Sequence, residues 1–258
     1  MVALKLKDYF DHTLVLPKIP DPDNFGHTAE VTQWGMLGNG PDGNDADVPV
    51  GDCAFAGPEH IIMGWLAAAN KPAVPFDYAS TIAMYSEVTG YDPSQYDPAT
   101  GENPTDQGGD MTSIAEFWQA TGFTAADGST HKIGAYLALE PGNIDQLTAA
   151  LYVFEAVGMG FALPSSAEDQ FENGEPWSVV ADATIEGGHF VPLLGKWNGL
   201  WQGITWAQPQ LIETDFISTY TQLPIVYLSQ EFMDNGESPE HFDMAQLQAD
   251  LAALNAVA

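Results

Sequence analysis

The sequence predicts an α+β fold, with helices in the first half of the chain and antiparallel strands in the second. Apolar residues recur at helical spacing in several segments before Gly158, whereas short apolar runs separated by turn residues follow it. The chain has 258 residues, of which 45% are hydrophobic, and it contains no stretch typical of an interdomain linker. We therefore expect one large domain, or two closely packed lobes, around a full hydrophobic core.

The first long helix is expected to begin at Cys53, the only cysteine, and to end at Asn70-Lys71-Pro72. Pro58 disfavours an uninterrupted helix, because an interior proline removes a hydrogen bond, and it indicates a tight first turn followed by the helix proper. His60 is expected to be a packing residue or to support the residues of the site from behind. One side of this helix is apolar and carries Ile61, Ile62, Trp65 and Leu66.

A second helix is expected over residues 76–89, followed by a long acidic loop over residues 90–110. Ser113 and Glu116 have the spacing of a capping box, which predicts the start of a third helix that stops at Gly122. We expect the aromatic residues of this third helix to lie in the core.

A fourth helix is expected between a capping residue at Asn143 and a stop at Gly158. Beyond it, Asn198-Gly199 between apolar runs is a strong hairpin signal. A helical turn is predicted over residues 215–220, and a C-terminal helix from Ser238-Pro239. The predicted strands cover residues 159–163, 177–183, 189–194 and 225–228.

Together these elements predict a single domain over residues 1–258. Its parts are an extended arm (1–50), a mainly helical lobe (51–158), a mainly antiparallel sheet (159–235) and a docking helix (236–258). Within the arm, the loop over residues 39–47 is only weakly similar to a calcium loop. Ala46 occupies its fifth ligand position and no glutamate closes a frame of about 12 residues. No metal or cofactor is therefore expected.

The composition is strongly acidic, with six lysines, no arginine and a formal net charge of −30. This charge argues against nucleic acid as a partner, because phosphate binding depends on lysine and arginine, and it disfavours anionic membranes as well. A basic protein surface or a cationic ligand suits the chain better. The alternative is that the charge only maintains solubility or adapts the protein to high salt.

The N-terminal residues contain no apolar core of signal-peptide length, and no apolar run approaches the ~20 residues of a membrane span. We therefore expect neither a classical signal peptide nor a membrane span. A single cysteine is compatible with a reducing cytoplasm and equally with a virus particle assembled there. The oligomeric state is open.

A lone cysteine can form neither an intramolecular disulfide nor a thiolate metal site, but it can act as a nucleophile beside a histidine. Gly187-Gly188-His189 places a histidine at the head of an alternating apolar run, 136 positions after Cys53 (189 minus 53). At a helix N-terminus the macrodipole would lower the pKa of the Cys53 thiol. The alternative is a buried, inert cysteine and an unrelated strand histidine.

Four short stretches stand out together: Met36-Leu37-Gly38-Asn39, Gly51-Asp52-Cys53, Gly187-Gly188-His189 and Thr205-Trp206. With these motifs the chain resembles the papain-like cysteine peptidases, in particular divergent bacterial and phage-encoded members. In that family the cysteine and histidine lie about 130 to 150 residues apart. The resemblance implies a two-lobed fold, with an N-terminal helical lobe that carries the nucleophile helix and a C-terminal antiparallel sheet or half-barrel. The family's usual Cys-Gly-Ser-Cys-Trp surroundings are absent.

The resemblance also implies a mechanism in which a cysteine thiolate attacks a carbonyl and a histidine takes and returns the proton. Cys53 and His189 match these two roles. An upstream amide side chain would help to hold the oxyanion. Asn39 is named for this role, although it stands 14 positions before the cysteine (53 minus 39), and Gln33 and Asn44 are alternatives.

A third polar residue should orient the imidazole. Relatives place an asparagine two residues before a tryptophan, where this chain has Ile204. A two-residue turn at Asn198-Gly199 would place Gln208 opposite His189, so Gln208 is the predicted orienting residue and Thr205 is the alternative.

Two functions remain open at this point. The first is a cysteine hydrolase that acts on a peptide or protein substrate. The second is a papain-like scaffold that serves as a structural or binding component of a phage particle and keeps the Cys53–His189 pair as a remnant. The missing asparagine, the extra residues before the cysteine and the charge favour the second, whereas the retained cysteine and histidine motifs favour the first.

Overall fold

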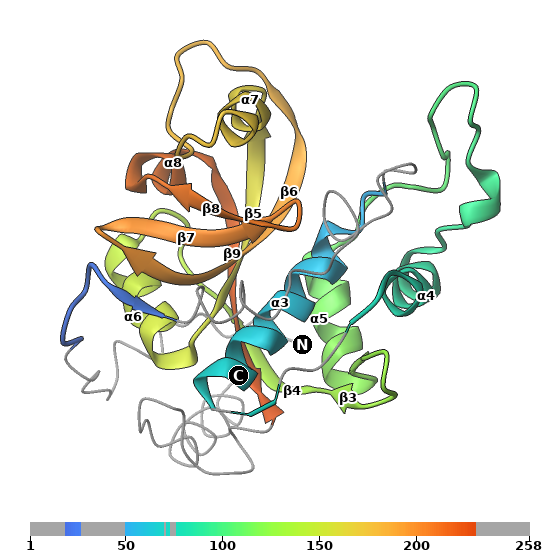
Figure 1. Cartoon of the computed structure of the whole chain (residues 1–258), viewed down its shortest axis with the longest axis horizontal. Coiled ribbons are helices and arrows are strands. Elements are labelled where there is room, and N and C mark those ends of the chain that lie inside the picture. The colour runs from blue at the N-terminus through green and yellow to red at the C-terminus, as the bar shows by residue number, and fades with distance from the viewer. Residues whose placement is uncertain (1–18, 27–49, 70, 73–75, 231–258) are drawn as a thin grey trace, which may run out of the picture.

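The computed structural model of the protein describes residues 19–26, 50–69, 71–72 and 76–230. Figure 1 shows the helices of residues 53–120 on one side and most of the antiparallel sheet, together with the later helices, on the other, while the long loop after residue 89 extends away from both. Within the described ranges, no helix is both long enough and apolar enough to cross a membrane. The helices of the first half are α3 (Cys53–Ala68), α4 (Tyr78–Thr89) and α5 (Met111–Ala120).

Helix α3 begins at Cys53, as predicted, but it runs unbroken through Pro58. The prediction of a separate first turn was therefore wrong. Apart from Cys53, the described residues of α3 are buried, so tertiary packing outweighs the hydrogen bond that Pro58 cannot donate.

Helices α4 and α5 are both started by aspartate caps. Asp77 precedes α4, which matches the second predicted helix. Asp110 precedes α5, and its carboxylate accepts a hydrogen bond from the backbone N–H of Ser113. The predicted capping box of Ser113 and Glu116 was wrong, because Asp110 provides the cap and both residues lie inside the helix.

Helix α6 (Ile144–Phe154) begins after Asn143, as predicted, and the Asn143 side chain accepts a hydrogen bond from the N–H of Gln146. The helix ends at Glu155, which adopts a left-handed conformation (φ 65°), rather than at Gly158. The shorter helices are η2 (Pro93–Gln95), α7 (Ser166–Glu172) and α8 (Thr214–Tyr220).

Seven strands of the described chain form one antiparallel sheet. Their bounds are β1 Phe25–Gly26, β4 Ile133–Ala138, β5 Val157–Pro164, β6 Ile185–Trp197, β7 Leu200–Thr205, β8 Gln208–Ile212 and β9 Thr221–Ser229. The strand order is β4-β9-β5-β6-β7-β8, and β1 pairs with β6. A separate hairpin consists of β2 (Phe123–Thr124) and β3 (Thr130–His131).

The predicted strand over residues 177–183 was wrong. Trp177 forms only an isolated bridge with Ile212, and its buried indole donates a hydrogen bond to the carbonyl of Ala167. Val179 and Val180 are exposed, so the apolar run that suggested a strand lies on a surface loop. The strands β4 and β8 were not predicted.

The Asn198-Gly199 hairpin is confirmed. Both residues have positive φ angles, 50° and 78°, as a two-residue hairpin turn requires. The predicted register holds from the turn to the pair of Gly195 with Gln202, and it shifts beyond that pair at a bulge. The bulge decides which residues of β7 lie near His189.

Aromatic side chains fill the core between the helices and the sheet. Trp65 of α3 stacks on Trp118 of α5 with ring centroids 5.5 Å apart, and Trp118 contacts Tyr227 of β9 at 4.9 Å. Such pairs stabilise beyond the area that they bury. Most of the predicted N-terminal arm and the predicted docking helix lie outside the described residues.

Candidate active site

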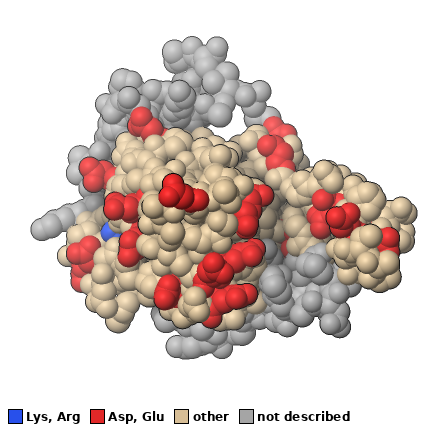
Figure 2. All heavy atoms as spheres, turned by 90° about the horizontal axis from the view of Figure 1, so that it is seen from above, with Lys and Arg blue, Asp and Glu red and all other residues tan. Residues whose placement is uncertain are grey.

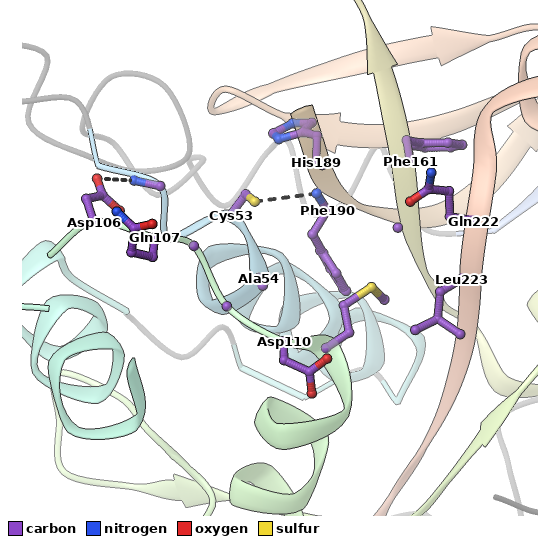
Figure 3. Close-up of a pocket in the computed structure, with 16 residues that line it drawn as sticks. Cys53, Ala54, Asp106, Gln107, Asp110, Phe161, His189, Phe190, Gln222 and Leu223 are labelled. Atoms are coloured by element: carbon purple, nitrogen blue, oxygen red, sulfur yellow. Dashed lines mark hydrogen bonds between the residues drawn. The ribbon is translucent and has the colours of Figure 1, made fainter. Parts of the chain in front are cut away.

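Cys53 and His189 line the same cavity, which has a volume of about 610 Å³. Cys53 is the first residue of α3 and is half-buried. The backbone N–H of Phe190 donates a hydrogen bond to the Cys53 sulfur at 3.4 Å, as Figure 3 shows. The thiol therefore contacts the residue next to His189 in β6.

A glycine in α3 makes this approach possible. A Cβ at Gly57 would stand 2.2 Å from the ring of Phe190, which is far below van der Waals contact. With no side chain at Gly57, α3 packs directly on β6 and brings Cys53 to the start of the buried part of that strand.

His189 is held by a hydroxyl and by two indole rings. Its Nε2 lies 2.6 Å from the Thr205 hydroxyl oxygen, and its ring stacks on Trp206 with centroids 5.2 Å apart and an interplanar angle of 22°. Trp177 packs edge-on against the same ring, with centroids 6.5 Å apart. These contacts restrict the imidazole to one orientation.

Gln208 does not lie opposite His189. The bulge in the pairing of β6 with β7 shifts the register, and the chain turns back at Trp206 and Ala207, which have φ angles of 47° and 56°. Gln208 therefore starts β8, where it pairs with Thr205 and is exposed. Thr205, the alternative in the sequence prediction, is the residue that contacts the imidazole.

The proposed oxyanion residues Asn39, Gln33 and Asn44 lie outside the described residues. Among the residues that are described, no group of three or more histidine, cysteine, aspartate or glutamate side chains could hold a metal ion.

No protein-family model and no curated protein matches the sequence. Solved structures match the fold. Xylellain, a cysteine protease from Xylella fastidiosa, has a TM-score of 0.53 at 14% identity over 82% of this chain and 94% of its own. A procathepsin L2 proteinase from the larval midgut of Tenebrio molitor has a TM-score of 0.55 at 12% identity over 87% of this chain and 73% of its own. The chain has a papain-like fold.

In this papain-like fold, the cavity wall on the helix side consists of the loop before α5. Gly108 and Gly109 line the cavity from this loop, and Figure 3 shows Asp106 and Asp110 on either side of them in sequence. Among the described residues that line the cavity there is no lysine, and His189 is the one basic side chain beside the carboxylates of Asp106 and Asp110.

Two titratable groups are buried in α3 and do not line the cavity. Burial raises the pKa of Glu59 well above its usual range, although a hydrogen bond from the Thr81 hydroxyl at 2.8 Å opposes this, and nearby Asp52 raises the pKa further. Burial lowers the pKa of His60 to about 4, so its imidazole is neutral at pH 7. His60 is thus buried and uncharged, as expected of a packing residue.

Three features of the site had no signal in the sequence. The N–H of Phe190 is a backbone group, and the left-handed turn at Trp206 uses residues that are not typical of turns. The third is a hydrogen bond from Tyr85 to Asp106 on the helix side. The first and the third depend on residues that only the fold brings together.

Proposed function

We propose that the protein is a papain-like cysteine hydrolase that attacks a peptide or amide carbonyl with Cys53 and His189. The observation that supports this most is that the two residues open on one cavity, where the Phe190 N–H contacts the thiol and Thr205 contacts the imidazole. A nucleophile, a base and a group that orients the base make up the arrangement expected of nucleophilic catalysis.

In the proposed reaction, His189 Nδ1 takes the thiol proton, since Nε2 contacts Thr205. The Cys53 sulfur forms a bond to the carbonyl carbon, and the carbonyl oxygen becomes an oxyanion. The C–N bond then breaks as the imidazolium returns its proton to the leaving amine. Water, deprotonated by the same imidazole, hydrolyses the thioester and restores the thiol.

The start of α3 suits this chemistry. This helix of 16 residues places the positive end of its macrodipole at Cys53, which favours the thiolate. Backbone N–H groups at the same helix start are suitable donors to an oxyanion. The indoles of Trp206 and Trp177 shield the imidazole from water and strengthen its hydrogen bond to Thr205.

We extend the proposal to basic peptide or protein substrates. Figure 2 shows acidic side chains spread over the visible face, with a basic side chain only at its edge, and the whole chain carries a formal charge of −30. Opposite charge accelerates association and is screened over about 8 Å at physiological ionic strength. From the resemblance to phage-encoded peptidases, we also propose action in a host cytoplasm or in a virus particle.

Two observations favour the second function, a scaffold without activity. The carboxyl group of Asp52 is buried directly before Cys53, and a negative charge at this place disfavours a thiolate. In addition, a hydroxyl contacts His189 where relatives use an amide.

The rate of Cys53 alkylation by iodoacetamide as a function of pH tests the two functions. Alkylation that is already fast near pH 6, together with peptide hydrolysis that is lost in Cys53→Ala and His189→Ala, supports the hydrolase. Alkylation that stays negligible up to about pH 9 in folded protein supports the scaffold, because an unperturbed thiol has a pKa near 8.5. Cys53→Ser provides the blank for the labelling.

A further inference from the structure

Tyr85 and Asp106 connect two segments of the cavity wall that the proposed chemistry does not use. The Tyr85 hydroxyl donates a hydrogen bond to Asp106 Oδ1 at 2.5 Å and accepts one from the Gly108 N–H at 3.1 Å. Asp106 Oδ2 accepts a hydrogen bond from the Gly51 N–H at 2.9 Å, which Figure 3 shows as a dashed line. We call these two side chains the Tyr85–Asp106 clamp.

The clamp binds the backbone N–H groups of Gly51 and Gly108, and both glycines line the cavity that contains the thiol. Gly51 stands two residues before Cys53, and Gly108 belongs to the loop before α5. The fit at Gly51 is close, because a Cβ there would lie 2.9 Å from Asp106 Oδ1. Gly108 has a left-handed conformation (φ 68°) that favours glycine. The clamp thus sets the distance between the segment that leads to the nucleophile and the loop beside it.

The ring of Tyr85 is fixed by packing, and its hydroxyl stays protonated and able to donate a hydrogen bond. Tyr85 is fully buried, and its ring lies between Phe55, with centroids 5.5 Å apart, and Tyr91, with centroids 4.9 Å apart. Burial and the neighbouring Asp106 both raise the Tyr85 pKa, so the phenol remains a donor at every ordinary pH. A hydrogen bond to a carboxylate is about twice as strong as a neutral one.

No covalent link within the chain can do the same task. Cys53 is the only cysteine, so an intramolecular disulfide cannot hold the loop at residues 106–110 to the segment before the nucleophile. The side-chain hydrogen bonds of Tyr85 and Asp106 join the two segments instead.

We propose that Tyr85 and Asp106 are positioning residues that hold the loop over residues 106–110, called the Gly108 loop, in the place where a peptide substrate lies against it. The proposal rests on the proposed function, because it assigns the wall to peptide binding. Loss of the Tyr85 hydroxyl should displace the Gly108 loop and leave the Cys53–His189 pair in place, since Phe190 and Thr205 hold that pair from the sheet side.

The test compares Tyr85→Phe with Tyr227→Phe. Both substitutions remove the hydroxyl of a buried tyrosine and keep its ring, and neither tyrosine lines the cavity itself. The Tyr85 hydroxyl bonds to Asp106 and Gly108, which line the cavity, whereas Tyr227 lies on β9. Two alkylating reagents report on the site: iodoacetamide, which needs only the thiol, and a lysine-containing dipeptidyl chloromethyl ketone, which also needs the wall. Tyr85→Phe should slow inactivation by the peptidyl reagent about tenfold and change the iodoacetamide rate less than about twofold. Tyr227→Phe should leave both rates within about twofold.

Amide hydrogen exchange provides a second readout that needs no activity. The N–H groups of Gly51 and Gly108 should be protected in the native chain, and Gly108 should exchange at least about tenfold faster in Tyr85→Phe than in Tyr227→Phe. Equal exchange and equal rate ratios in the two variants would overturn the clamp. If the native chain reacts with iodoacetamide but not with the peptidyl reagent, the proposed function fails, and the exchange of Gly108 still decides the clamp. If Tyr85→Phe does not fold, Asp106→Asn, at a half-buried loop position, makes the same comparison.

Discussion

On the sheet side of the cavity, His189 lies in a strand with paired neighbours on both sides, and Thr205 and Trp206 hold its ring. On the helix side, the Gly108 loop has no strand pairing and is held by the side chains of Tyr85 and Asp106. The sheet side thus takes its geometry from cooperative backbone pairing, and the helix side from a few side-chain contacts. We therefore expect substitutions on the sheet side to affect the chemical step and substitutions in the clamp to affect substrate binding.

The largest effect is expected where the two sides meet, at the thiol. Cys53→Ala should reduce peptide hydrolysis by at least roughly 10³-fold, because the nucleophile is lost, and should leave the fold intact. Hydrolysis of a lysine-containing fluorogenic peptide measures the activity, and far-UV circular dichroism checks the fold. Activity that persists in Cys53→Ala would show that the cavity is not the reacting site.

The free energy of unfolding should fall most when the contact of α3 with β6 is disturbed. Gly57→Ala places a Cβ against the Phe190 ring and should destabilise the protein by about 1–3 kcal/mol, which exceeds the gain of up to about 1 kcal/mol that alanine brings to a helix. Urea unfolding measures the change. Gly187→Ala is the control, since no atom lies within 4 Å of its Cβ position, and it should change stability by less than about 0.5 kcal/mol. Equal midpoints for the two variants would contradict the close packing.

Thr205→Val should sharpen the assignment of the orienting residue. The substitution keeps the shape of the side chain and removes the hydroxyl that contacts His189 Nε2, so kcat should fall about five- to tenfold with little change in KM. Gln208→Ala should have less than a twofold effect, because Gln208 is exposed on β8. The opposite order of effects would restore Gln208 to the role that the sequence suggested.

The smallest effect is expected from Glu59 in α3, and it depends on pH. Its raised pKa favours folding at low pH, and this contribution is lost as the pH rises through the folded-state pKa. Glu59→Gln mimics the neutral acid and can donate to Thr81, so it should be more stable than the native chain at pH 8 and nearly equal to it near pH 4.5. Urea unfolding at the two pH values measures this difference.

His60 gives the opposite slope in both chains and therefore cancels from that comparison. Its folded-state pKa of about 4 lies below the ordinary value of 6.5, so the stability that it contributes is present above pH 6.5 and is lost as the pH falls toward 4. If Glu59→Gln had the same advantage at both pH values, the ionisation of Glu59 would not be its cause.

Local chemistry allowed the sequence alone to predict a large part of this fold. The start of α3 at Cys53, the Asn143 cap of α6 and the Asn198-Gly199 hairpin each depend on residues that are near in sequence and have specific backbone preferences. The spacing of Cys53 and His189 likewise pointed to the two residues that share the cavity.

Tertiary structure decided the contacts around those residues. The bulge in β6 and the left-handed turn at Trp206 put Thr205 rather than Gln208 beside the imidazole. The residue types do not predict this turn, in which the Trp206 ring packs against His189 and Trp177. The Tyr85–Asp106 clamp joins residues from α4 and a distant loop through side chains. Hydrogen bonds of this kind have no periodicity, so they become visible only when the chain is folded.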